Sequence, residues 1–296
     1  MSWERSGTDY WRQSSELIFQ HHKLEKGLCL PRTSRRFFGQ VAAENTVSLM
    51  KEWRQCGLDV TAPVYRAAEG VLRSYRAAII AMPGRETVQK RLLNEIDGLV
   101  SDEIDIAYRT PLIPPKVPDG AYATLLALSQ SRRSTRDFAS RPVDLTLLER
   151  AATVAQLSPS ACNRQPWHLH LYDDPEAIKA MLALQNGNSG FGHTVPLLAV
   201  ITSDMASFFD SSERMQPVLD GGLFLMTLLL ALEAQGLATC CLNWCVDPAT
   251  DKKGHRIGAI PEQEKILTFL AIGYREEGAT SPLSARRPIE DVIRHH

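Results

Sequence analysis

The 296-residue sequence lacks both a long hydrophobic run and an excess of charge of one sign. Its longest apolar stretch, Leu223 to Leu232, is shorter than the roughly 20 apolar residues that cross a bilayer. The 33 basic residues nearly match the 34 acidic ones, so the formal net charge is −1. These absences give no reason to expect a membrane span, or binding to nucleic acid or to an anionic membrane surface.

The cysteines lack the spacing of a disulfide framework or of a metal site. The six are scattered, and the group Cys240, Cys241 and Cys245 has neither CxxC spacing nor a histidine close by in sequence. The first ten residues are polar, without the apolar core of a secretory signal. We therefore expect free thiols, no metal site and a cytoplasmic protein.

Apolar residues repeat at helical spacing over most of the first hundred residues, where no useful strand-like alternation occurs. Val64, Val71 and Tyr75, for example, fall on one face of a helix. A group of four prolines that follows this region excludes regular structure there. The pattern predicts an all-helical N-terminal extension over residues 1–112 and a second domain over residues 113–296.

After the prolines, helical and strand patterns alternate. His168 to Tyr172 alternates polar and apolar residues, as a half-buried strand does. The continuous apolar run Leu197 to Ile201 is typical of a central strand, and Ile266 to Ile272 predicts the last strand. Gly221 to Gln235 is apolar nearly all round, which predicts a buried helix. The expected class is α+β, with a sheet wrapped by helices around a buried central helix.

Two segments carry side chains suited to a phosphorylated planar ligand. Ser131 to Arg136 holds three arginines, whose guanidinium groups make charge-assisted, often bidentate bonds to phosphate. A solvated basic helix end is the alternative. The loop Ser158 to Trp167 offers hydroxyl and amide groups that both donate and accept, which suits the pyrimidine edge of a flavin. An ordinary turn followed by a core tryptophan is the alternative.

Two later segments have ordinary structural explanations when each is taken alone. Gly236 to Trp244 leaves the apolar helix and enters a strand-like stretch, as a helix ending at a glycine does. Ser284 to Pro288 has the composition of a charged tail.

The four segments, taken in this order, resemble the pattern of the nitroreductase family. The chain carries Arg-Arg-Ser-x-Arg from Arg132 and Pro-Ser-x-x-Asn-x-Gln-Pro-Trp from Pro159. An apolar helix then ends in Gly236-Leu237, and Ser-x-Arg-Arg-Pro follows from Ser284. The first two motifs are specific when they occur together in this order.

The resemblance covers the chain from about Ala121 to its end. In the extension, His22 to Leu28 is similar to a His-x-Leu-Glu-Lys-Gly-Leu motif of a longer subgroup of the family. That subgroup has a helical N-terminal extension and is often associated with polysaccharide biosynthesis.

The resemblance implies a nitroreductase-like mixed sheet and a homodimer with FMN at the subunit interface. The residues that it assigns to the phosphate, the ribityl chain and the pyrimidine end are Arg132, Arg133, Ser134 and Arg136, with Arg286 and Arg287 also at the phosphate. Those that it assigns to the ring are Pro159, Ser160, Asn163 and Gln165, with backbone amides of Leu242 and Asn243 facing flavin N5.

The resemblance also implies electron transfer from NAD(P)H through FMN to a small organic acceptor, of nitro, quinone or enone type, by a ping-pong mechanism. No dedicated acid–base residue is expected, and the sequence has no separate Rossmann glycine fingerprint. The alternative is a flavin-binding structural or regulatory module in a glycan-assembly complex, without steady turnover. It stays open whether Phe191, His193, Phe208 and Phe209 line a substrate pocket or pack in the core.

Overall fold

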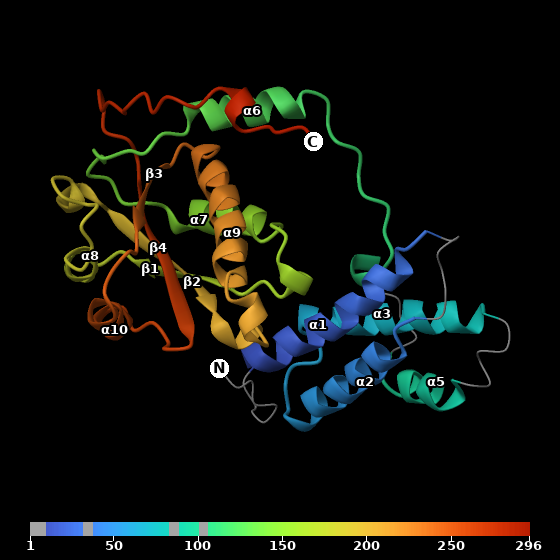
Figure 1. Cartoon of the computed structure of the whole chain (residues 1–296). Helices are drawn as coiled ribbons and strands as arrows, with labels where there is room; N and C mark the ends of the chain where they lie inside the picture. Colours follow the sequence, from blue (N-terminus) through green and yellow to red (C-terminus); the bar gives the residue numbers. More distant parts are fainter. Residues whose placement is uncertain (1–9, 32–37, 83–88, 101–105) are drawn as a thin grey trace. The chain divides into compact units, whose positions relative to one another are not determined.

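The computed structural model describes residues 10–31, 38–82, 89–100 and 106–296, and the chain forms two compact units (Figure 1). The first unit joins residues 1–119 to two later segments, 158–167 and 203–223. The second unit comprises residues 120–157, 168–202 and 224–296. The domain division expected between residues 112 and 113 stays a prediction.

Packed helices form the body of the first unit. They are α1 (Tyr10–Leu28), α2 (Gln40–Gln55), α3 (Pro63–Ile80) and α5 (Lys90–Asp97), followed by the 3-10 helix η2 (Ile106–Tyr108). The helix α1 packs on both α2 and α3. The core includes Leu17, Met50, Trp53 and the predicted α3 residues Val71 and Tyr75, all buried. The helical N-terminal extension is therefore confirmed for the described residues.

Two segments from the middle of the chain complete the first unit. They contribute the 3-10 helices η3 (Ala161–Asn163), η5 (Met205–Ser207) and η6 (Ser211–Glu213). Of these, η3 and η5 contact α1. Ser15 on α1 and Ser207 share a buried hydrogen bond of 2.9 Å between their hydroxyls. Phe19 on α1 meets Phe209 edge-on, with 4.5 Å between ring centroids. The helical extension thus packs on the loop in which the ring-binding residues are predicted.

A four-stranded sheet, in the order β1-β2-β4-β3, organises the second unit. The strands are β1 (Trp167–Tyr172), β2 (Leu197–Asp204), β3 (Ala238–Asn243) and β4 (Glu264–Gly273). The pair β3 and β4 is antiparallel, with Ala238 opposite Gly273 and Asn243 opposite Thr268. Every residue of β2 is buried, as its continuous apolar run predicts for an internal strand. The predicted strands and the α+β class are confirmed.

Further helices accompany this sheet. They are α6 (Ala121–Ser131), α7 (Leu145–Ala155), α8 (Pro175–Leu182) and α10 (Pro248–Ile257), with the 3-10 helices η4 (Gly192–Thr194) and η7 (Ile289–Asp291). The carboxylates of Asp144, Asp174 and Asp247 accept hydrogen bonds from first-turn amides of α7, α8 and α10. The core of the unit includes Met181 and Phe269, both fully buried.

The central helix α9 (Gln216–Glu233) is buried along one face only. Phe224, Leu228 and Leu232 are buried, as the prediction of a buried helix requires. The opposite side exposes an apolar stripe of Val218, Leu219, Leu223 and Met226, with exposed fractions of 39–55%. The segment Ser211–Glu233 is long enough and apolar enough to cross a membrane. The core helix of a soluble protein can have the same length and mean hydropathy. The predicted buried helix is therefore confirmed along one face, and its other side is exposed in the single chain, because apolar composition does not reveal what covers each face.

Candidate functional site

The residues predicted to bind FMN divide between the two units. Those in the second unit are Arg132, Arg133, Ser134, Arg136, Leu242, Asn243, Arg286 and Arg287. Those in the first unit are Pro159, Ser160, Asn163 and Gln165.

Residues 132–136 run beside strand β3. Ser134 forms a parallel bridge with Thr239, and the Thr135 amide donates to the Thr239 carbonyl at 2.9 Å. Ser134 and Arg136 also reach the next residue of that strand, Cys240. Burial raises the pKa of the Cys240 thiol, while the charge of Arg136 and a hydrogen bond with Ser134 act to lower it. The structure thus brings the arginine segment to the strand that ends in Leu242 and Asn243.

The three arginines of this segment present positive charge without a carboxylate partner. Arg132 and Arg133 are half-buried, and Arg136 is exposed. Within the described ranges, none of the three forms an ion pair with an aspartate or a glutamate; Arg133 instead donates to the Arg132 carbonyl at 2.9 Å. A phosphate can take such unpaired guanidinium groups as partners, because their planar forks match its oxygens.

The end of β3 is held by two side chains. The Thr268 hydroxyl donates to the Leu242 carbonyl at 2.8 Å, and the Gln185 amide donates to the Asn243 carbonyl at 3.1 Å. Leu242 is buried, whereas Asn243 is exposed. These bonds fix the backbone at the position where amides are predicted to face a flavin.

The loop of residues 158–167 has an unusual backbone. Cys162, Asn163 and Gln165 all adopt positive φ, between 51° and 57°. The Ser160 hydroxyl accepts from the Gln165 amide at 3.0 Å, and the Gln165 side chain donates to the Asn163 carbonyl at 3.0 Å. Pro159 is exposed. Left-handed conformations of non-glycine residues persist where the surroundings enforce them, often at ligand sites.

Arg164 anchors this loop, a role that sequence reasoning missed. Its side chain is fully buried, and it donates to the carbonyls of Ala161 at 2.9 Å and Ser207 at 2.8 Å. It also forms an ion pair with Glu213. Burial acts to raise the pKa of Glu213, but hydrogen bonds from Arg164 and from the Phe209 amide hold it below its usual range. No sequence signal separates this arginine from the neighbouring polar residues.

The C-terminal arginines lie in an exposed tail. Arg286 donates to the Ser284 carbonyl, and both Arg286 and Arg287 are exposed. In the described part of a single chain, neither makes a hydrogen bond or an ion pair with residues 132–136. Their predicted part in phosphate binding stays a prediction.

The aromatic residues left open by the sequence differ in their surroundings. Phe191 is buried in the core of the second unit. Phe208 and Phe209 lie against the guanidinium of Arg164, at 4.9 and 4.8 Å from their ring centroids. Core packing therefore accounts for Phe191, and a cation–π contact accounts for Phe208 and Phe209.

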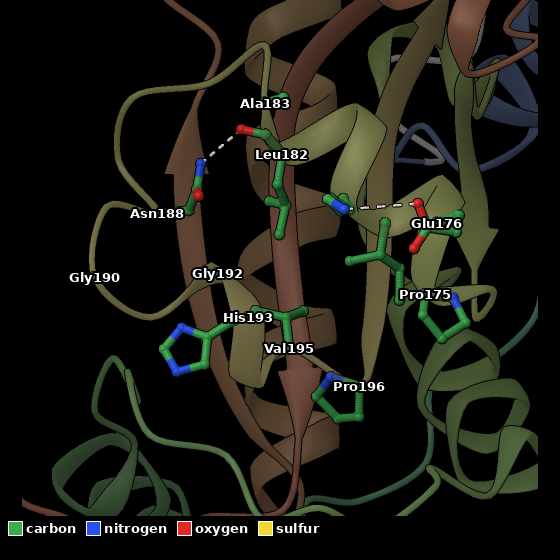
Figure 2. A pocket seen from close by; sticks show the side chains of 12 residues that line it. Pro175, Glu176, Leu182, Ala183, Asn188, Gly190, Gly192, His193, Val195 and Pro196 are labelled. Carbon is green, nitrogen blue, oxygen red and sulfur yellow. Dashed lines mark hydrogen bonds and ion pairs between the residues drawn. The ribbon is translucent and has the colours of Figure 1, made fainter.

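His193 lines a pocket of the second unit with a volume of about 580 Å³ (Figure 2). Leu182 and Val195 contribute apolar wall, while Lys179 and Glu176 lie 3.8 Å apart at this pocket. None of the residues predicted to bind FMN lines it. Its mixed lining carries no cluster of cations for a phosphate.

Residues 130–274 match the model of the nitroreductase family. The 4-nitrobenzoate reductase of Pseudomonas putida is 25% identical over 206 residues, which cover 52% of this chain and 86% of that protein. An iodotyrosine deiodinase of Drosophila melanogaster is 25% identical over 209 residues, covering 60% and 70% of the two chains.

Solved structures share the fold. The FMN-dependent nitroreductase of Clostridium difficile R20291 has a TM-score of 0.50 at 20% identity, over 58% of this chain and 99% of that one. NfrA2 of B. megaterium has a TM-score of 0.51 at 20% identity, over 58% and 73%. The predicted nitroreductase-like fold is confirmed.

Proposed function

We propose, since residues 130–274 belong to the nitroreductase family, that this protein is an FMN-dependent oxidoreductase. Two similar proteins are named 4-nitrobenzoate reductase and iodotyrosine deiodinase, and both names refer to small aromatic compounds. The fold of an FMN-dependent nitroreductase is shared as well. FMN supplies two-electron transfer when bound, and the protein supplies its orientation and electrostatic surroundings.

The observation that carries this proposal is the arginine segment beside β3. Arg132, Arg133 and Arg136 lie together without carboxylate partners within the described residues, next to a backbone that Thr268 and Gln185 fix. This donor set fits the phosphate of FMN, whose oxygens accept several charge-assisted hydrogen bonds. Arg132 and Arg133 would hold the phosphate, and Ser134 the ribityl hydroxyls. A cation such as Arg136 near the pyrimidine end would favour a negatively charged reduced ring.

The loop of residues 158–167 would orient the isoalloxazine ring. Its enforced left-handed backbone and its internal hydrogen bonds hold Ser160, Asn163 and Gln165 in one arrangement. Arg164 would act as a positioning residue, because its buried side chain holds the loop through three polar contacts. A ring held in this way needs little rearrangement when a substrate arrives.

The donor and the acceptor follow from the same proposal. NAD(P)H would bind first and leave, and a small nitro, quinone or enone compound would then occupy the same space. Such a ping-pong order needs no separate nicotinamide domain, in line with the absence of a Rossmann fingerprint in the sequence. The scattered spacing of the six cysteines suits a reducing, cytoplasmic setting.

The functional form would be a homodimer. A second copy of the chain would cover the exposed apolar stripe of α9. It would also cover helix α6, which has no buried residue and in which Tyr122 is 79% exposed. Large exposed apolar patches mark interaction sites on soluble proteins.

The test is the visible absorption spectrum of the purified protein, followed by anaerobic addition of NADPH and then NADH. We expect flavin bands that bleach with at least one nicotinamide and return when an acceptor is added. Failure to bind FMN even from excess would refute the proposal. Bound flavin that neither nicotinamide reduces would favour the alternative, a flavin-binding structural or regulatory module in a glycan-assembly complex.

A further inference from the structure

Three neighbouring strands of the second unit bring two imidazoles, a hydroxyl and a carboxylate together. His168 and His170 alternate on β1, so both side chains leave the same face of that strand. Thr202 belongs to β2 and Glu264 begins β4, the next strands in the sheet order. The cluster is separate from the residues predicted to bind FMN.

The side chains of this cluster lie close enough together to share one ion. His170 Nε2 lies 2.6 Å from Glu264 Oε2, and His168 Nδ1 lies 3.5 Å from Glu264 Oε1. One ligand atom from each of the three residues lies within 4.8 Å of the other two. The two rings are nearly parallel, with an interplanar angle of 13°. Around a tetrahedral zinc ion with Zn–N bonds of about 2.0–2.1 Å, ligand atoms are about 3.3 Å apart. Side-chain adjustments would bring the three atoms to this spacing.

Two imidazoles lie beside one buried carboxylate in this cluster. Glu264 is 3% exposed, and its Oε2 already accepts from His170 and from the Thr202 hydroxyl. The second imidazole stands at 3.5 Å from Oε1, beyond the 2.7–3.2 Å of ordinary N–H···O bonds. Two imidazoles directed at one buried carboxylate are a common feature of metal centres, where the ion fills such a gap.

We propose that His168, His170 and Glu264 form a binding site for one divalent first-row transition metal, with Zn²⁺ as the ion that fits best. Mixed nitrogen and oxygen ligands exclude Ca²⁺ and Mg²⁺, which prefer oxygen alone. The side chains of His168 and His170 are 18% and 23% exposed, which gives the ion a path from solvent. Three protein ligands leave one position for water or for Thr202, and the bound ion would tie β1 to β4 across β2.

The experiment is a Zn²⁺ titration of the full chain in competition with a chromophoric chelator, under reducing conditions. All proteins carry His295→Gln and His296→Gln, because the two exposed terminal histidines would bind zinc themselves. We expect one equivalent to bind, and His168→Ala or His170→Ala to weaken this binding at least about 100-fold. The expected loss exceeds the 10- to 100-fold decrease in metal affinity that follows the removal of a residue that hydrogen-bonds to a ligand. His193→Gln, a histidine outside the cluster, should bind as the starting protein does.

Thermal unfolding with and without Zn²⁺ provides a second readout. The ion should raise the Tm of the starting protein and of His193→Gln, but not that of His170→Ala. Circular dichroism checks that each variant folds, and Glu264→Gln, which keeps the shape of the side chain, replaces any variant that does not. The proposal is overturned if the starting protein binds no zinc, or if the cluster variants bind and respond as it does.

Discussion

Arg132 is the residue on which the proposed phosphate site depends most directly. It is half-buried at the end of α6, next to β3, without a carboxylate partner in the described residues. Arg132→Ala should weaken FMN binding by about 1.5–3 kcal/mol, the usual loss for a hydrogen bond to a charged group. FMN fluorescence titration measures the change. Arg150→Ala, which removes an exposed arginine of α7, serves as the control for lost charge and should bind FMN normally. Unchanged affinity in Arg132→Ala would remove this arginine from the site.

The buried side chain of His21, on α1, makes the stability of the first unit depend on pH. The side chain is 2% exposed, and its ring nitrogens have no hydrogen-bond partner among the described residues. Burial lowers its pKa to about 4, against an ordinary value of 6.5, with Glu25 acting in the opposite direction. Above pH 6.5 the ring is neutral in both folded and unfolded chains. Below pH 6.5 only the unfolded chain takes up the proton, so stability falls by about 1.4 kcal/mol per pH unit until pH 4.

The measurement is urea unfolding at pH 7.5 and at pH 5.0, for the wild type and for His21→Leu. The wild type should lose about 2 kcal/mol more than the variant between the two values, since other groups titrate equally in both proteins. The variant should be no less stable at pH 7.5, because it removes buried polar atoms that lack partners. An equal loss in the two proteins would contradict the lowered pKa.

For single residues, the sequence indicated which chemistry a side chain offers, but not which distant residues it contacts. The arginines of residues 132–136 were predicted to bind phosphate because that binding requires their residue type, whatever the fold, and this role stays a prediction. Arg164 was missed because its role comes from Ser207 and Glu213, which lie 43 and 49 residues away. His168 and His170 gave only a strand pattern, since their partner Glu264 is 94 residues from His170.

Secondary-structure elements were predicted where local periodicity determines them. The alternation at His168 to Tyr172 and the apolar run at Leu197 to Ile201 became β1 and β2. The same rule predicted α9 but not its exposed side, because periodicity shows which residues are apolar and not what covers them. We therefore expect a second copy of the chain to cover the exposed stripe of α9.

A charge in this stripe should prevent dimer formation. Leu219 is 55% exposed in the single chain, and Leu219→Asp would place a carboxylate inside the proposed interface without touching the core. Light scattering coupled to gel filtration should give the mass of a dimer for the wild type and of a monomer for the variant. Leu157→Asp, at an 83% exposed leucine outside α9, should remain dimeric. A dimeric Leu219→Asp protein, or a monomeric wild type, would show that this face is not the interface.

For the whole molecule, the sequence predicted the order of helical and mixed regions but not how the segments group. The first compact unit gathers residues 158–167 and 203–223 with the N-terminal helices. Contacts such as the hydrogen bond between Ser15 and Ser207 join residues 192 positions apart, and no local sequence pattern predicts them. The extension therefore belongs with the loop predicted to hold the flavin ring, which makes it part of the flavin-binding proposal.

Removal of FMN should lower the thermal stability of the whole protein. A ligand that binds only the folded state at 100 times its Kd stabilises it by about 2.7 kcal/mol, or roughly 4 °C in Tm for a chain of this size. Protein stripped of flavin and returned to excess FMN should regain that shift. Riboflavin has the same ring without the phosphate, so it should give a smaller shift if residues 132–136 bind the phosphate. Equal shifts with FMN and riboflavin would mean that the ring alone is bound, and no shift with either would argue against a flavin site.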